Sequence, residues 1–460
     1  MAPTPVPTAA PTPVPTAAPA LEPLPAPAGA LVFEDDFGAG PEKSGLVASW
    51  AAPELTLSVA SGAYSMQLAQ PVDTRWMLLP RVAAGDFSLQ IDLADTSVDR
   101  SGSAAAGVVF RARDGRNFYA LLIDARTGRY SIRKQEGGSW SELIPWKPAA
   151  QIRQGSEVNQ LRLDAQGESF TIYLNGALID RFRDGAFASG MVGTIVDSNG
   201  AAQPQLQFDN LKLWSSDPPP PPSNLPATRQ NAIGIDMVLI PGGEFIMGSN
   251  DDPNALPHMV MLPDFYIDRK EVTNIIYVVC ADAQGCALPA PVDSATRKPY
   301  FGAQEFNTYP VINVTWEQAR YYCEAQQKRL PTEAEWEKAA SWNATTRAKS
   351  IWPWGDQFTA GRLNSAEANQ GDTVMVGTYA AEQNGTFDLA GNAAEWTSTL
   401  NRPYPYDGDD GREDLQTTDD RIVRGGSWAQ PQEASTGHAR RPHPPAAASN
   451  QIGFRCVAGP

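Results

Sequence analysis

The sequence predicts a multidomain protein in which an all-β jelly-roll sandwich is followed by an irregular α+β domain. Three observations predict this fold class. A chain of 460 residues is too long for one compact core. Residues 30–215 consist of short runs that alternate apolar and polar side chains between turn residues. A proline run at 218–222 then separates them from a second half, residues 231–460, that is rich in Gly, Pro and Trp.

The chain begins with a proline-rich segment at residues 1–28. The octapeptide Ala-Pro-Thr-Pro-Val-Pro-Thr-Ala occurs twice in tandem, at 2–9 and at 10–17. Proline at this density favours an extended polyproline II conformation and cannot form a core. We therefore expect a stalk at 1–28 and, around the later proline run, a semi-rigid linker at 216–230.

Three runs carry the strand pattern of the first domain most clearly. Apolar and polar side chains alternate at 87–93 and 161–163, and a third apolar-rich run at 171–174 ends in the turn pair Asn175-Gly176. No stretch of useful length in 30–215 has the period of a helix. The pattern is typical of an all-β sandwich.

In the second domain, two helices can be placed from their first residues. Thr315 with Gln318, and Thr332 with Glu335, have the spacing of a capping box, in which each side chain bonds the backbone of the other. Pro331 lies between the two predicted helices and stops the first.

The charge of the chain limits its partners. A formal net charge of -16 and no run of Lys and Arg leave no surface that could neutralise phosphates, so we expect no nucleic-acid partner. No apolar run reaches the about 18 residues that cross a bilayer, so we expect membrane contact only through an anchor upstream of this chain. Clustered acidic oxygens suit hard cations such as calcium.

Four cysteines occur, and they allow three pairings: Cys280, Cys286, Cys323 and Cys456. The close spacing of Cys280 and Cys286 suits a local loop, and the other two would then close a long one. Bridges of this kind indicate an oxidising compartment, so we expect an extracellular or cell-surface location on a bacterium. Four buried free thiols in a cytosolic protein are the alternative.

The second half resembles the formylglycine-generating (sulfatase-modifying-factor) family. Its most specific motifs are Lys328-Arg329-Leu330-Pro331-Thr332-Glu333, Gly391-Asn392-Ala393-Ala394-Glu395-Trp396, Arg424-Gly425-Gly426-Ser427-Trp428 and Gly453-Phe454-Arg455-Cys456. Further similar blocks stand in order at 237–249, 265–274, 310–316 and 352–356. The resemblance implies a compact fold related to C-type lectins and a disulfide between Cys323 and Cys456.

The first half resembles a concanavalin/laminin-G-like jelly roll through short pieces: Phe110-Arg111, Asn117-Phe118-Tyr119, Tyr130-Ser131-Ile132-Arg133 and Phe208-Asp209-Asn210-Leu211. Relatives of that kind bind glycans or act as spacers, and some are glycosidases. A glycosidase needs two carboxylates that face each other across a cleft. No acidic pair in this half stands out from ordinary solvated side chains.

The family resemblance also implies calcium. One family site corresponds to Asp388, Gly391, Ala393 and Glu395, and a second corresponds to Asn364, Ser365, Asp372 and Val374. Carboxylates and backbone carbonyls are the ligands that calcium prefers. Because Asn, Asp and Gly also favour turns, a purely structural role for these residues is the alternative.

The decisive departure from the family's oxidases follows Trp428. Those enzymes bind copper(I) through two cysteines, whose positions here hold Gln430 and Ser435. An amide and a hydroxyl cannot replace thiolates, so we expect neither copper nor the oxidase activity. The family's iron-dependent branch needs more histidines than His258, His438 and His443, and we expect His258 at the surface.

These observations favour an extracellular, non-catalytic protein that binds a glycan or a protein ligand. A groove for that ligand is predicted from the positions where relatives hold peptides, with Tyr404, Tyr406, Trp428, Gln430, Ser435 and His438 as its lining. Two alternatives remain: an oxidase or other modifying enzyme of the family, and a display protein with a hypervariable loop at 429–451.

Overall fold

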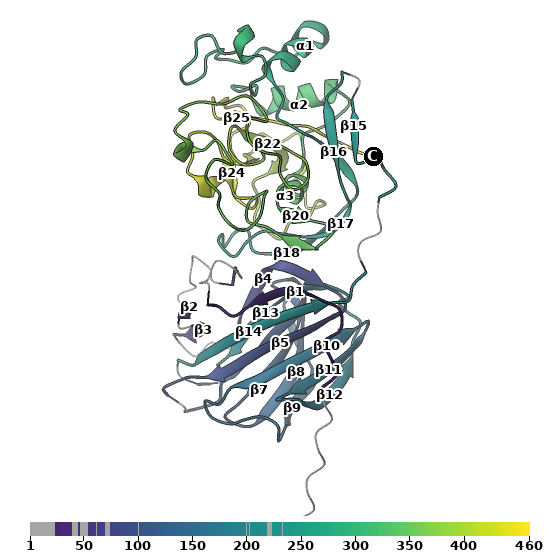
Figure 1. The fold of residues 1–460 in the computed structure, drawn as a ribbon, viewed down its shortest axis with the longest axis vertical. Coiled ribbons are helices and arrows are strands. Elements are labelled where there is room, and N and C mark those ends of the chain that lie inside the picture. The colour runs from purple at the N-terminus through teal and green to yellow at the C-terminus, as the bar shows by residue number, and fades with distance from the viewer. Residues whose placement is uncertain are drawn as a thin grey trace, which may run out of the picture.

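The computed structural model describes residues 24–38, 45–46, 54–60, 62–69, 74–99, 101–198, 200–201, 203–218, 223–231 and 233–460. Two folded parts are stacked along the long axis of the molecule (Figure 1). The tandem octapeptide at 2–17 lies outside the described residues. None of the helices in the described part of the chain has the length and apolarity needed to cross a bilayer.

The first part is a sandwich of two antiparallel sheets of the jelly-roll kind, as predicted. One sheet has the order β12-β11-β10-β5-β14-β3-β2, with β1 also paired to β14, and the other contains β4-β13-β6-β7-β8-β9. The strands are β1 (Ala30–Asp35), β2 (Leu55–Ala60), β3 (Ala63–Leu68), β4 (Thr74–Ala84), β5 (Phe87–Asp95), β6 (Ala105–Asp114), β7 (Asn117–Asp124), β8 (Arg129–Glu136), β9 (Ser139–Pro148), β10 (Asn159–Gln166), β11 (Ser169–Leu174), β12 (Ala177–Arg183), β13 (Gly190–Asp197) and β14 (Gln205–Ser215).

The alternation seen in the sequence places every second side chain of these strands between the sheets. Leu89, Ile91 and Leu93 of β5 face Leu161 and other apolar residues of the same buried cluster. Asn175 takes a positive φ of 51° in the turn between β11 and β12, which is the conformation that an Asn-Gly turn needs. The three predicted runs are therefore confirmed as strands β5, β10 and β11.

The second part contains short elements joined by long irregular segments. Its strands are β15 (Thr228–Gln230), β16 (Asp236–Ile240), β17 (Gly243–Met247), β18 (His258–Leu262), β19 (Phe265–Asp268), β20 (Trp342–Asn343), β21 (Ala348–Lys349), β22 (Ala394–Leu400), β23 (Arg421–Arg424), β24 (Arg440–His443), β25 (Ile452–Gly453) and β26 (Val457–Ala458). Its helices are α1 (Asn274–Gln284), α2 (Trp316–Ala325) and α3 (Glu333–Ser341), with short 3-10 turns at Gln304–Phe306, Ala366–Ala368 and Gln432–Ser435.

Both predicted helices begin where their capping boxes predict. The Thr315 side chain accepts from the Gln318 backbone, and Thr332 does the same with Glu335, while each partner side chain bonds back. Helix α1 was not predicted, because Thr273 at its N-cap makes no side-chain capping bond and its first turn holds no acidic residue. Sequence reasoning had no local signal for it.

Two disulfides stabilise this domain. Cys280 bonds Cys286 across the end of α1, and Cys323 of α2 bonds Cys456 near the C-terminus. The pairing implied by the family resemblance is confirmed. The second bridge joins segments that are 133 residues apart, so it closes most of the domain into one loop.

The two domains share a buried interface. Strand β21 of the second domain pairs with β4 of the sandwich, where Ala348 lies opposite Val82. Apolar side chains from both domains form one cluster, in which Leu78, Val109 and Phe118 of the sandwich pack with Phe245 and Val260.

Ion pairs surround this interface. Arg113 contacts Glu244 at 2.5 Å, and Arg81 contacts Asp356 at 3.0 Å. The two domains therefore form one continuous body.

The segments predicted as stalk and linker also make contacts. Thr228–Gln230, assigned to the linker, forms β15 and pairs with β16 of the second domain. Asp217 accepts hydrogen bonds from the backbone of Gly85 and ion-pairs with Arg347, which joins the two domains beside the linker. The segment predicted as a semi-rigid linker, 216–230, therefore ends in a strand of the second domain.

The last residues of the predicted stalk lie against the sandwich. The backbone of Ala28 donates to Ser88, and Arg162 donates to the carbonyl of Pro25 at 2.5 Å. Within residues 24–28, the chain is therefore part of the folded surface rather than a free stalk.

Candidate functional site

A group of buried carboxylates lies at the centre of the second domain. It contains Glu271, Glu382, Asp388 and Glu395, all at most 9% exposed. The guanidinium of Arg455, which is itself fully buried, contacts Glu395 at 2.7 Å. Four carboxylates around one such cation leave an excess of buried negative charge, which costs free energy unless protons or cations neutralise it.

The local chain conformation explains how these groups meet. Glu271 follows the end of β19, and its two oxygens accept from the Ala393 backbone at 2.9 Å and from the Asn392 side chain at 2.7 Å. Asp388 has a positive φ of 58°, and its carboxylate accepts from the Gly377 backbone at 2.6 Å. The segment 388–395 therefore folds around the side chain of a residue that lies more than 100 positions earlier in the sequence.

The pKa values of this group reflect the excess charge. Burial raises the pKa of Asp388 to about 6, against the opposing effects of the Gly377 backbone and Arg455. Burial also raises the pKa of Glu382 to about 7, with Asp388 adding to the shift. For Glu271, burial and then the charges of Asp388 and Glu395 raise the pKa well above its ordinary value.

The four residues of the first predicted calcium site are brought together here, but they differ in availability. The oxygens of Glu395 accept from Arg455 and from the indole of Trp336, both at 2.8 Å. Asp388 has one oxygen to which no described group donates. Gly391 and Ala393 are also buried. Asp388 and the surplus charge therefore fit a cation, while the Glu395 carboxylate is already engaged.

The second predicted site lies directly beside the first. Asn364 forms a bridge with Gly391, and its side-chain amide donates to the Asp372 carbonyl and to Asn392. The side-chain oxygen of Asn364 is buried without a hydrogen-bond partner among the described groups, so it could ligate a cation.

Asp372 fits a ligand role less well. Its carboxylate accepts from the hydroxyls of Ser294 and Thr296 and from two backbone amides. Ser365 is buried and donates to Glu367, and Val374 is half-buried and donates its backbone N–H to Asn392. Within the described residues, no group of three or more His, Cys, Asp or Glu side chains is arranged to hold a metal ion. The second site thus stays a prediction.

Of the two positions that hold cysteines in the family's oxidases, Gln430 precedes the 3-10 turn Gln432–Ser435 and Ser435 is its last residue. The Gln430 side chain accepts from Ser427 at 3.2 Å. Ser435 is fully buried and its hydroxyl has no hydrogen-bond partner among the described groups. Gly426 packs so closely on Ser435 that a Cβ there would lie 2.3 Å from its hydroxyl oxygen. Ser435 is therefore a packing residue, and its prediction as groove lining is wrong in this arrangement.

The other predicted groove residues divide into separate surroundings. Trp428 is half-buried, and its indole donates to the carbonyl of Asn450. Tyr404 packs its ring against His258, and Arg440 lies over it. Tyr406 donates its backbone N–H to His258 and its hydroxyl to Glu413.

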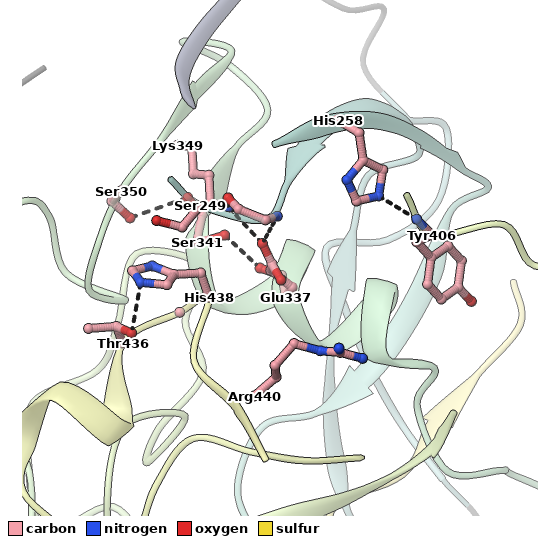
Figure 2. A network of polar contacts seen from close by, with 12 residues as sticks. Ser249, His258, Glu337, Ser341, Lys349, Ser350, Tyr406, Thr436, His438 and Arg440 are labelled. Atoms are coloured by element: carbon pink, nitrogen blue, oxygen red, sulfur yellow. Dashed lines mark hydrogen bonds and ion pairs between the residues drawn. The ribbon is translucent and has the colours of Figure 1, made fainter. Parts of the chain in front are cut away.

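Figure 2 shows Tyr406 beside His258 and His438 beside Thr436, with Glu337 and Lys349 between the two pairs in that view. His438 lies 3.4 Å from Asp251, and burial lowers its pKa. The six residues therefore do not form a single open groove. Cavities of about 340 and 220 Å³ in this domain are lined by other residues.

His258 lies inside the protein, so the expectation of a surface position is wrong. It is 2% exposed, and burial lowers its pKa to about 4. Its Nε2 accepts from the Tyr406 backbone, so the ring is neutral with its proton on Nδ1, toward the carbonyl of Leu256. A neutral imidazole with both nitrogens engaged serves packing rather than metal binding.

Sequence reasoning missed Glu271, Glu382 and Asn392 as members of the carboxylate site. Asn392 bridges the two predicted calcium sites, since its side chain bonds both Glu271 and Asn364. Asn392 and Glu271 stand inside motifs that the family shares, and this was the available signal. Glu382 stands in no such motif, and its place depends entirely on the fold.

Comparison with known proteins agrees with this domain. Residues 222–459 match the model of the family described as "Sulfatase-modifying factor enzyme 1-like domain". The chain is 34% identical over 285 residues to the "Inactive C-alpha-formylglycine-generating enzyme 2" of Bos taurus, covering 50% of this chain and 90% of that one. It is 32% identical over 248 residues to the "Serine/threonine-protein kinase pkn1" of Chlamydia pneumoniae, covering 50% of this chain but only 39% of the kinase.

The sandwich is similar in fold to a solved structure of a carbohydrate binding module. A carbohydrate binding module, CBM66 from Bacillus subtilis, superimposes with a TM-score of 0.31 and 20% identity, covering 37% of this chain and 99% of the module.

Proposed function

The chain belongs, through residues 222–459, to the family of sulfatase-modifying factor enzyme 1-like domains, and from this premise we propose that it is an extracellular, non-catalytic protein that binds a glycan or protein ligand. The proposal places ligand recognition on the joined body of the two domains. Copper has no part in it.

The observation that carries this proposal is that no thiol is left for the oxidase chemistry. The sequence contains four cysteines, and they form two disulfides. The copper positions of the oxidases hold Gln430 and the buried Ser435. Copper(I) selects soft thiolate ligands, which an amide and a hydroxyl do not supply. The bovine relative, whose name calls it inactive, supports the same interpretation.

The disulfides also support the proposed location. Bridges between distant segments, such as Cys323 with Cys456, form and persist in oxidising compartments. In the cytosol of a bacterium, these cysteines would instead be kept reduced.

We further propose that calcium binds at Asp388. Two observations support this site: buried carboxylates are in surplus, and one oxygen of Asp388 accepts no hydrogen bond from the described groups. The family resemblance also implies the backbone carbonyls of the neighbouring Gly391 and Ala393 as ligands. A bound divalent cation would supply the positive charge that Arg455 alone does not.

The first experiment tests the absence of oxidase activity. The full chain is incubated with copper and a cysteine-containing peptide, and oxygen consumption is recorded. A matched variant, Gln430→Cys with Ser435→Cys, restores both thiols on the same scaffold. We expect no turnover by the wild type, and turnover by the wild type would overturn the proposal.

The second experiment tests binding. The full chain is applied to a glycan array and to a peptide array, with calcium and with chelator, beside Asp388→Asn. Asparagine tolerates the positive φ of this position, so the variant removes the charge and keeps the backbone. We expect ligand binding by the wild type and a calcium affinity at least about tenfold weaker in the variant, measured by calorimetry. Unchanged calcium affinity would refute the cation site.

A further inference from the structure

A second candidate site lies beside the carboxylate group and shares Glu271 with it. A cavity of about 340 Å³ opens where the chain passes from β19 into α1. Its volume is in the range of small-molecule pockets. It is lined by Ile235, Asp236, Asp268, Arg269, Lys270, Glu271, Val272, Thr273, Ile276 and Phe387.

Two cationic side chains face this cavity without a carboxylate partner. Within the described residues, neither Arg269 nor Lys270 has an acidic oxygen within 4.0 Å; Arg269 donates only to the carbonyl of Gly385. The Arg269 guanidinium and the Lys270 ammonium lie 5.4 and 5.2 Å from the centre of the Phe387 ring, which holds them in place. Adjacent unpaired cations are notable in a chain with 52 acidic and 36 basic residues.

The acidic residues around the cavity do not neutralise these cations. Asp268 is paired with Lys328, and Glu271 is turned toward Asn392 and Ala393. Asp236 is exposed and accepts from Gln230 at 2.8 Å. None of these three carboxylates therefore pairs with Arg269 or Lys270.

Other lining residues supply further recognition. Thr273 makes no capping bond with its own helix, so its hydroxyl can bond a ligand. Ile235 and Ile276 are half-buried and apolar. The cavity therefore offers both polar and apolar contacts.

We propose that this cavity binds a small organic anion, whose carboxylate is held by Arg269, Lys270 and the hydroxyl of Thr273, and whose apolar body lies against Ile235, Ile276 and Phe387. The site goes beyond the proposed glycan or protein recognition and does not depend on it. The Lys270 ammonium attracts the Asp388 carboxylate at longer range. Calcium bound at Asp388 would neutralise that carboxylate and leave the Lys270 charge available to the ligand.

The test uses phenylacetate as the probe, with the full chain in calcium-containing buffer. Ligand-observed NMR titration compares phenylacetate with neutral phenylacetamide and with inorganic phosphate. We expect phenylacetate to bind at least tenfold more tightly than phenylacetamide, which lacks the negative charge. We expect the same margin over phosphate, which lacks the apolar body. Equal binding of phenylacetamide, or of phosphate, would overturn the proposal.

Two variants locate the site. Lys270→Met keeps the length of an exposed side chain and removes its charge, and we expect it to weaken phenylacetate binding at least tenfold. The matched control is Lys212→Met, on β14 of the sandwich, which we expect to bind like the wild type. Because Lys270 is exposed, we expect the Lys270→Met variant to keep the fold. An unfolding midpoint equal to that of the wild type checks this. Undiminished binding by Lys270→Met refutes the proposal.

Discussion

Arg455 partly offsets the charge of the buried carboxylates in the second domain, so its loss is expected to destabilise that domain strongly. It is fully buried, its Nε lies 2.8 Å from both oxygens of Glu395, and its terminal nitrogens donate to the carbonyls of Asp268 and Phe387. Arg455→Met keeps the apolar stem but leaves Glu395 buried and unpaired. Breaking a buried pair in this way costs about 3–5 kcal/mol.

The measurement is urea unfolding with the disulfides intact, followed by tryptophan fluorescence. The matched control is Arg183→Met, whose partner Glu168 lies 3.4 Å away and where both side chains are more than half exposed. Exposed pairs contribute at most about 1 kcal/mol, so the control is expected to unfold near the wild-type midpoint. If Arg455→Met loses no more stability than the control, then Glu395 is not a charged group that depends on Arg455, and the argument from surplus charge fails.

Three further outcomes are expected. Glu337 is fully buried, and burial raises its pKa, but the charges of Lys349 and Arg424 outweigh burial and hold the pKa at about 2. As the pH falls, the Glu337 carboxylate is therefore protonated first in the unfolded chain. About 3 kcal/mol of stability is expected to be lost between about pH 4.5 and pH 2. Urea unfolding at a series of pH values checks this, and Glu337→Gln should lack that part of the slope. Replacing Cys323 and Cys456 by serine should cost about 5 kcal/mol, because their loop spans 133 residues, against about 2 kcal/mol for the pair Cys280 and Cys286, which spans 6; similar losses in urea for both would contradict the loop-entropy account. Leu78→Arg places a charge in the apolar interface and should separate the domains, seen as a larger radius of gyration in small-angle scattering, whereas Leu178→Arg at an exposed site of β12 should not.

Local signals explain the elements that could be predicted. The Thr315 and Thr332 capping boxes involve residues three positions apart, so the sequence contains both partners of each bond. Alternation in β5 likewise reports which side of the strand is buried. Helix α1 lacks such a signal, because its cap makes no side-chain bond and apolar residues occur on all its faces.

The predicted groove shows where local reasoning fails. Tyr404 and Trp428 are 24 positions apart in the sequence, yet one packs on His258 and the other bonds Asn450. Neither partner has a fixed relation to these residues in the sequence. Whether Ser435 faces solvent likewise depends on Gly426, which packs against it from the segment that follows β23.

By itself, the sequence determined the all-β character of the first domain with strands β5, β10 and β11, two helices of the second domain, the pairing of Cys323 with Cys456 through its family resemblance, and the absence of the oxidase cysteines. Only the tertiary structure decided that Glu271, Glu382 and Asp388 share one buried space with Arg455, that the sandwich joins the second domain through Leu78 and Phe245, and that Arg269 and Lys270 face a cavity unpaired. The physical reason is the separation along the chain of the residues that interact. Capping and alternation depend on neighbours along the chain, whereas burial and charge balance depend on which distant segments the fold brings together.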